Sequence, residues 1–151
     1  MKGFYEVTDK LKTLLNAEPF VNTVTYGSID DVDLDKQSIF PLSHIIVNNA
    51  VVGTKTTTFS ISILAMDIVD ISNDEITDTF VGNDNEQDVL NTQLALLTRV
   101  INELQRGDSY TDKYQVEADV TCEPFMDRFE NKLAGWTATF SVMVVNDMTV
   151  C

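Results

Sequence analysis

The stretch TTTFSISILAMDIV, residues 56–69, decides the fold. In its first half Phe59, Ile61 and Ile63 alternate with hydroxyl residues, so the apolar side chains of a strand would share one face. Over residues 64–68 the alternation disappears, because apolar side chains also occupy the positions of the hydroxyl face. A β-bulge or burial on both faces would explain this change. We therefore predict a long strand with one of these two features in its second half.

Further strand signals lie on both sides of this stretch. Residues 39–47 predict a strand, and Asn48 to Gly53 predict a turn region after it. Residues 114–122 and 136–145 predict two more strands, and a shorter one falls within residues 20–29. One face of the last strand would be formed by Trp136, Ala138, Phe140, Val142 and Val144.

Two helices complete the pattern, because apolar residues recur at helical spacing in residues 4–15 and 89–104. The second helix would follow Asp84, which stands where an N-cap belongs, and end before Gly107, a natural C′ residue. At about 20 residues it would be roughly 30 Å long, enough to cross a sheet. We predict an α+β fold with a largely antiparallel, mixed sheet covered by the long helix and an N-terminal helix.

Length and composition fit one globular domain over residues 1–151. Lys plus Arg is 10 and Asp plus Glu is 24, so the formal net charge is −14. A protein that coats DNA needs clustered cations, which this chain lacks. We expect a soluble protein made in a reducing cytoplasm, because the sequence has neither an apolar run of about 18 residues nor the apolar core of a secretion signal.

Candidate chemistry is sparse. Asp31, Asp33 and Asp35 begin like a calcium loop, but the positions of the turn glycine and the bidentate glutamate hold Lys36 and Leu42. A solvated loop is therefore the preferred interpretation, and a weak cation site is the alternative. We expect neither a metal nor another cofactor, and we expect no enzymatic activity.

Single residues add little to this picture. His44 is the only histidine and lies in an apolar strand, which favours a core or interface residue over a catalytic one. Asp67 interrupts the apolar run of its strand, and we expect it at a sheet edge or paired with a neighbouring strand rather than acting as an acid or base. Cys122 and Cys151 are expected to be free, unreactive thiols.

Three stretches together resemble one protein family: residues 59–70 (FSISILAMDIVD), residues 82–94 (GNDNEQDVLNTQL) and residues 122–151, which include CEPFMDRFENKLAGWTATF and end in NDMTVC. The combination resembles small virion proteins of tailed bacteriophages, especially phages of Bacteroidota hosts. Members are described as tail terminator, tail completion or neck ring proteins. The resemblance covers residues 40–151, and the N-terminal helix matches only in pattern.

This resemblance implies a structural protein with a tail-terminator-like fold. It implies a homo-oligomeric ring at the head–tail junction or the top of the tail, with six copies as the first choice and twelve as the second. Its partners would be neighbouring neck and tail proteins, and DNA would pass through the ring without specific binding. The protein would be made in the cytoplasm of the host bacterium and reside in the virion.

We expect the contacts with neighbours on two segments, residues 30–37 and 123–135, which are long for connections in a compact domain. The second combines apolar and charged residues, as interface cores do, and Arg128 would pair with acidic neighbours. Alternatively, Phe125 and Phe129 fold back onto the protein's own core. The predicted interface residues are Asp31, Asp33, Asp35, Phe125, Met126, Asp127, Arg128, Phe129, Glu130 and Lys132.

Two other functions remain as alternatives to a ring subunit. A soluble acidic adaptor or DNA mimic would use the negative charge to bind a basic partner. A small cation-dependent hydrolase would use Asp31, Asp33 and Asp35.

Calcium provides a direct test of the acidic run at residues 31–35. Because this run lacks the turn glycine and the bidentate acid, we expect the melting temperatures with calcium and with a chelator to agree within error. Thermal unfolding followed by fluorescence measures both. A rise of many degrees at modest calcium concentration would contradict the expectation.

Overall fold

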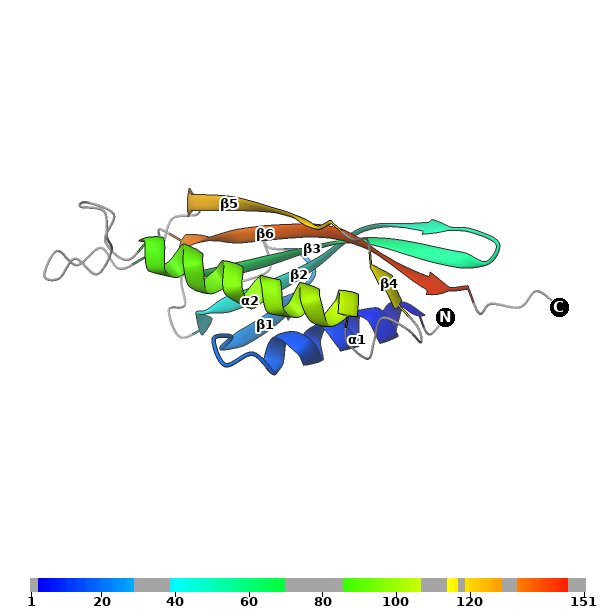
Figure 1. Ribbon diagram of the computed structural model, residues 1–151, viewed down its shortest axis with the longest axis horizontal. Helices are drawn as coiled ribbons and strands as arrows, with labels where there is room; N and C mark the ends of the chain where they lie inside the picture. Colours follow the sequence, from blue (N-terminus) through cyan, green and yellow to red (C-terminus); the bar gives the residue numbers. More distant parts are fainter. Residues whose placement is uncertain are drawn as a thin grey trace, which may run out of the picture.

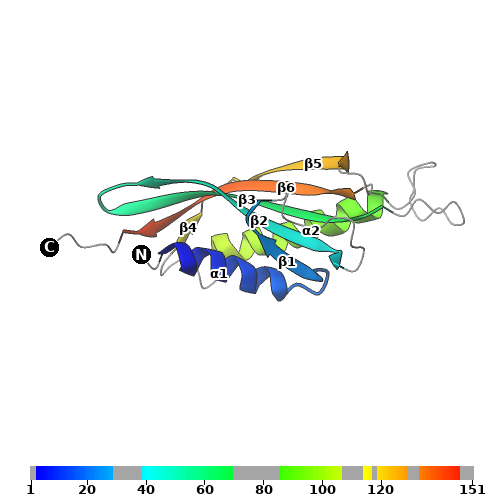
Figure 2. The same ribbon diagram turned by 180° about the vertical axis from the view of Figure 1, so that it is seen from behind.

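The computed structural model describes residues 3–28, 39–69, 86–106, 114–116, 119–128 and 133–146. Both helices pack on the same face of a six-stranded sheet (Figures 1 and 2). The sheet order is β1-β2-β3-β6-β4, and β5 also pairs with β6. The predicted α+β fold with a mixed, largely antiparallel sheet is confirmed, since β1 alone pairs in parallel among the described strands. The elements are α1 (Gly3–Asn16), β1 (Thr23–Tyr26), β2 (Leu42–Val52), β3 (Thr56–Ile68), α2 (Glu86–Arg106), β4 (Tyr114–Val116), β5 (Thr121–Arg128) and β6 (Leu133–Val145).

The centre of the sheet is the antiparallel pair of β3 and β6, which stays in one register from Thr56 opposite Val145 to Ile68 opposite Leu133. Near one end of this pair, Gly135 lies opposite Met66. A Cβ atom at residue 135 would overlap the carbonyl oxygen of Ala65. Glycine is therefore required there by the close approach of the two backbones.

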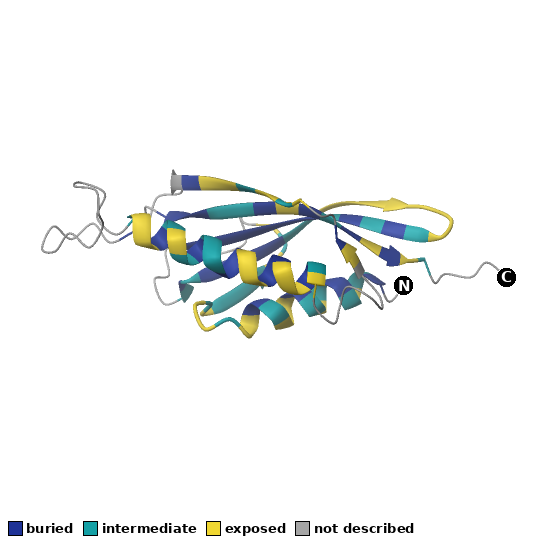
Figure 3. Cartoon of the chain, viewed as in Figure 1, coloured by how far each residue is buried: buried dark blue, intermediate teal, exposed yellow. Residues whose placement is uncertain are grey.

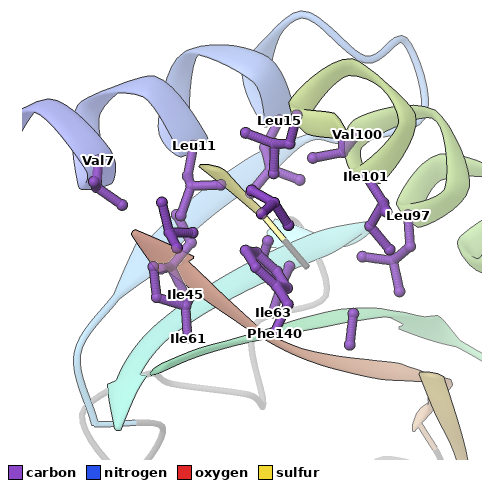
Figure 4. Packing of buried hydrophobic residues seen from close by; sticks show 14 of the residues in the cluster. Val7, Leu11, Leu15, Ile45, Ile61, Ile63, Leu97, Val100, Ile101 and Phe140 are labelled. Carbon is purple, nitrogen blue, oxygen red and sulfur yellow. The ribbon is translucent and has the colours of Figure 1, made fainter. Parts of the chain in front are cut away.

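The main core lies between the sheet and the helices. Phe140 of β6 is 1% exposed and belongs to one cluster with Leu97 and Ile101 of α2 and with Leu11 and Leu15 of α1 (Figure 4). This arrangement confirms the predicted inward face of the last strand.

Hydrogen bonding adds to the packing between α2 and the sheet. The indole Nε1 of Trp136 donates to the Leu90 carbonyl oxygen at 2.8 Å. In α2 Leu94 is only partly buried, whereas Leu96 and Leu97 are fully buried. These two buried leucines belong to the side of the helix that packs on the sheet.

The second half of β3 is buried on both faces. Leu64 and Met66 pack in a second cluster, on the face away from the helices, which we call the end cluster: Phe40, Leu42, Leu64, Met66, Phe125 and Leu133. Of the two explanations for the lost alternation, burial on both faces is correct. The irregularity lies instead in β2, between Val47 and Asn49.

The turn expected at Asn48–Asn49 is wrong, because β2 continues to Val52. The register with β3 shifts by one residue at this point, which accommodates the asparagines without ending the strand. The Asn48 side chain donates to the Ser62 hydroxyl at 2.9 Å. The turn lies at Gly53, the last residue of the expected turn region, whose N–H donates to the Thr56 carbonyl.

The strand expected at residues 114–122 and the loop expected at 123–135 are both corrected. Two strands, β4 and β5, pair in succession along the same edge of β6. Val116 lies opposite Val142 and Thr121 opposite Thr139, so the edge strand is interrupted by extra residues between them. Residues 121–128 are thus paired backbone, and the last strand begins at Leu133.

Truncation of Phe140 tests this core. Because the ring is fully buried between α2, α1 and the sheet, we expect Phe140→Ala to lower the free energy of unfolding by about 3–5 kcal/mol. Denaturant unfolding measures the loss. Val145→Ala, on the same strand but 67% exposed, should change it by less than about 0.5 kcal/mol. A loss below about 1 kcal/mol for Phe140→Ala would contradict the assigned packing.

Candidate functional site

The two predicted contact segments are attached at one end of the sheet. Leu42, the first residue of β2, lies opposite Met66 near the end of β3. At the same end Arg128 of β5 lies opposite Leu133 of β6. The end cluster joins these points, since it contains Phe40, which follows the first segment, as well as Phe125 and Leu133 of the second.

The individual predicted residues have different outcomes. Phe125 is 9% exposed and packs in the end cluster, which is the alternative given for it above, so its ring is a core residue in this structure. Met126, Asp127 and Arg128 lie at the end of β5, where only their backbone is described. The remaining predicted residues lie outside the described part of the chain: Asp31, Asp33, Asp35, Phe129, Glu130 and Lys132.

Charge is distributed unevenly over the chain. The strands β2, β3 and β6, of 11, 13 and 13 residues, carry one formal charge, that of Asp67. Residues 29–38 and 70–85, by contrast, hold nine of the 24 acidic residues and one of the ten basic ones. Because the first of these segments precedes β2 and the second follows β3, both join the sheet at the end that carries the end cluster.

The sheet face away from the helices, which we call the open face, is lined by small hydroxyl residues beyond the end cluster. The Ser62 hydroxyl accepts from Asn48 at 2.9 Å and lies 3.1 Å from the Thr139 hydroxyl. These contacts link three neighbouring strands. No helix in the described part of the chain covers this face (Figures 1 and 2), which leaves a polar surface on which the exposed Glu123 of β5 lies opposite Thr137. Its further hydroxyl residues are Thr58, Ser60, Thr137 and Ser141.

His44 is a fully buried core histidine of β2. Its Nε2 lies 2.8 Å from the Gly27 carbonyl oxygen, and its Nδ1 lies 2.6 Å from the Thr25 hydroxyl. Because a carbonyl oxygen can only accept, Nε2 carries the proton and Nδ1 accepts from Thr25. Burial lowers the pKa of His44, and the Gly27 carbonyl opposes this in part. The neutral ring therefore ties β1 to β2.

Asp67 and Cys122 have no arrangement that suggests catalysis. Burial raises the pKa of the Asp67 carboxyl, while a 2.8 Å hydrogen bond from the Ile68 N–H opposes the shift. Burial also raises the pKa of the half-buried Cys122 thiol, which favours the less nucleophilic protonated form.

The open groove between α1 and α2, about 560 Å³ in volume, contains a charged side chain that already has a structural partner. Arg99 of α2 donates to the Glu18 carboxylate at 2.7 Å. Its guanidinium also lies 5.7 Å from the centre of the Phe20 ring. These contacts connect α2 to the chain that leaves α1, and neither points to a bound substrate.

Among the residues that the structure describes, no three His, Cys, Asp or Glu side chains are grouped as a metal site would require. In the same part of the chain neither helix has the length and apolar character needed to cross a membrane. A scan against models of protein families gives no match, and a search of curated proteins gives no similar one.

Two features of the site could not be foreseen from single motifs. The partners of His44 belong to β1, whose parallel pairing with β2 has no local sequence signature. Residues 45–54 (IIVNNAVVGT) carry no charge, although 23% of the chain is charged, and the sequence alone shows this. That this run lies along a sheet edge is known only from the structure.

The pH dependence of stability tests the role of His44. Its pKa in the native state lies below the ordinary value of 6.5, so the unfolded chain binds more protons between the two values. The free energy of unfolding should therefore fall as the pH falls through this window. We expect the wild type to lose more stability than His44→Gln between about pH 7 and about pH 5. Urea unfolding measures both, and equal losses would contradict the assignment.

Proposed function

We infer that this protein is a structural subunit of a tailed-bacteriophage virion, which forms a ring at the head–tail junction or the top of the tail. The resemblance described above suggests the class. In this role the protein joins neighbouring ring proteins, and the ring encloses a conduit for DNA. Six copies are the first choice for the ring and twelve the second.

The observation that carries the proposal is the convergence of both predicted contact segments at the end cluster. A contact surface built from two distant segments requires that the fold bring them together, and the pairs Leu42–Met66 and Arg128–Leu133 lie at the same end of the sheet. The buried apolar cluster beneath holds their points of attachment in fixed positions. This geometry supports a contact there with the next subunit or the next ring.

Charge also supports a conduit that does not retain DNA. With a net charge of −14 per copy, a ring would repel phosphate and leave a passing duplex mobile. The part of the open face formed by β3 and β6 complements this arrangement, because its side chains are uncharged and neighbouring proteins can approach them without like-charge repulsion.

Reversal of the charge at Arg128 tests the contact. Because a guanidinium pairs with carboxylates through two parallel hydrogen bonds, we expect Arg128→Glu to fold normally and to lose incorporation into particles. Circular dichroism and the melting temperature establish folding, and mass spectrometry of purified virions measures incorporation.

Arg106→Glu is the matched control for this experiment. Arg106 lies in the last turn of α2, is exposed, and makes the same charge change away from the end cluster. It should be incorporated normally. Normal incorporation of Arg128→Glu would contradict the proposed contact, and virions with a single copy of the protein would contradict the ring.

The acidic adaptor is the alternative that the negative charge favours. It predicts a complex with a basic partner that forms outside particles and weakens steeply with salt. Absence of the protein from purified virions, together with such a complex, would favour the adaptor over the ring subunit.

A further inference from the structure

The turn end of the β2–β3 hairpin extends beyond the two helices (Figures 1 and 2), and we call this part of the hairpin the arm. The outer strand of the arm is exposed (Figure 3). Val51 is 65% exposed and Val52 is 71% exposed. Residues 45–54 contain no charged side chain, and Lys55 carries the sole formal charge of the arm. The two valines lie on opposite faces of β2, so a neighbouring strand at this edge would cover one of them on each face.

The outer edge of β2 is unpaired along this arm. β1 pairs with β2 only as far as Ile45, and no other described strand adjoins the edge beyond it. The Gly53 N–H donates to Thr56, so hydrogen-bonded and non-hydrogen-bonded positions alternate from there. Ala50 and Val52 are consequently the residues whose N–H and C=O groups point away from β3. These four groups form a template for another strand.

The other edges of the described sheet are protected, in contrast to β2. β1 and β4 have 4 and 3 residues, and a short edge strand is one means of limiting edge pairing. β5 carries Pro124, which has no N–H, and the exposed charge of Glu123. Proline and charge are the usual means by which proteins block edge pairing. The edge at Ala50–Val52 carries neither proline nor charge, and the β-bulge of this strand lies further along, between Val47 and Asn49.

The arm is also held in place before any partner binds. The Asn146 N–H donates to the Lys55 carbonyl at 2.8 Å, and its side-chain amide donates to the Gly53 carbonyl at 2.8 Å. Both bonds fix the turn against the end of β6. A fixed edge loses little conformational entropy when it pairs, which favours binding.

We propose that the free edge of β2 binds the same edge of a second copy of this chain. The two strands would run antiparallel about a two-fold axis at Val51, with Ala50 of each copy opposite Val52 of the other. In this register the outward N–H and C=O groups of Ala50 and Val52 pair completely. The two Val51 side chains, adjacent across the axis, bury each other on the open face.

A second copy suits this edge because of charge. Two chains with a net charge of −14 each repel one another over most of their surfaces. Residues 45–54 carry no charge, so two copies that meet through this edge approach each other where like-charge repulsion is least. The contact is far smaller than a standard interface, and we therefore expect a weak dimer.

This pairing goes beyond the proposed ring subunit and does not depend on it. The ring contact lies at the end cluster, whereas the arm lies at the other end of β2 and β3. The pairing is a property of the purified chain, and the virion experiments above leave it untouched. The two proposals are therefore tested by different experiments, and either one can fail while the other holds.

Light scattering with size-exclusion chromatography tests the pairing over a range of protein concentrations up to about 1 mM. We expect the wild type to be a concentration-dependent dimer. Val51→Lys places two lysines opposite each other and should weaken the dimer at least about tenfold without lowering the melting temperature. Val145→Lys, at a similarly exposed valine of β6, should leave the dimer unchanged. A monomeric wild type at all concentrations would overturn the proposal, as would equal effects of the two lysines.

Disulfide cross-linking tests the register. In a Cys122→Ala, Cys151→Ala background, Val51→Cys should form a covalent dimer under mild oxidation, because directly opposite Cα atoms lie about 4.5 Å apart. Val145→Cys is the control and should remain monomeric. If Val51→Lys weakens the dimer but Val51→Cys does not cross-link it, a different strand of the second copy pairs with this edge. That result would overturn the two-fold register.

Discussion

The unbroken pairing of β3 with β6 is the constraint on which the rest of the structure depends. Its inner face supplies the apolar surface on which both helices pack, with Phe140 at the centre of that core. Its outer face divides into the end cluster and the hydroxyl surface. Close approach of the two backbones at Gly135 and Ala65 is part of the same constraint, since a larger residue would force the strands apart where the end cluster forms.

Periodicity predicted the elements that bury one side against a single core. The helices at residues 4–15 and 89–104 and the strand at residues 136–145 follow this rule, and their inward faces agree with the sequence. Residues 121–128 do not, because an edge strand with Pro124 and several charges has the composition of a loop. β6 supplies the hydrogen bonds that make it a strand, and a partner distant in sequence leaves no local signal.

The candidate site, too, depends partly on the local sequence and partly on strand pairing between distant parts of the chain. The segments at residues 30–37 and 123–135 were predicted as contact segments from their own length and composition. That both join the sheet at the same end follows only from the registers of β2, β3 and β6. The burial of Phe125 depends likewise on Phe40 and Leu42, which belong to another part of the chain. Residue types can therefore suggest a contact surface, whereas the pairing of strands decides which of its side chains are available.

The chain order determines when the central strands meet during folding. α2, β4 and β5 all lie between β3 and β6, so their pairing must close a long loop and is slow. The β2–β3 hairpin is joined by Gly53, Thr54 and Lys55 alone and forms within roughly 1–10 μs. On the ribosome, at roughly 5–20 residues per second, the hairpin precedes β6 by several seconds. The nascent chain therefore displays the edge of β3 that later pairs with β6 throughout that interval, and this edge is open to misassociation until β6 has been synthesised.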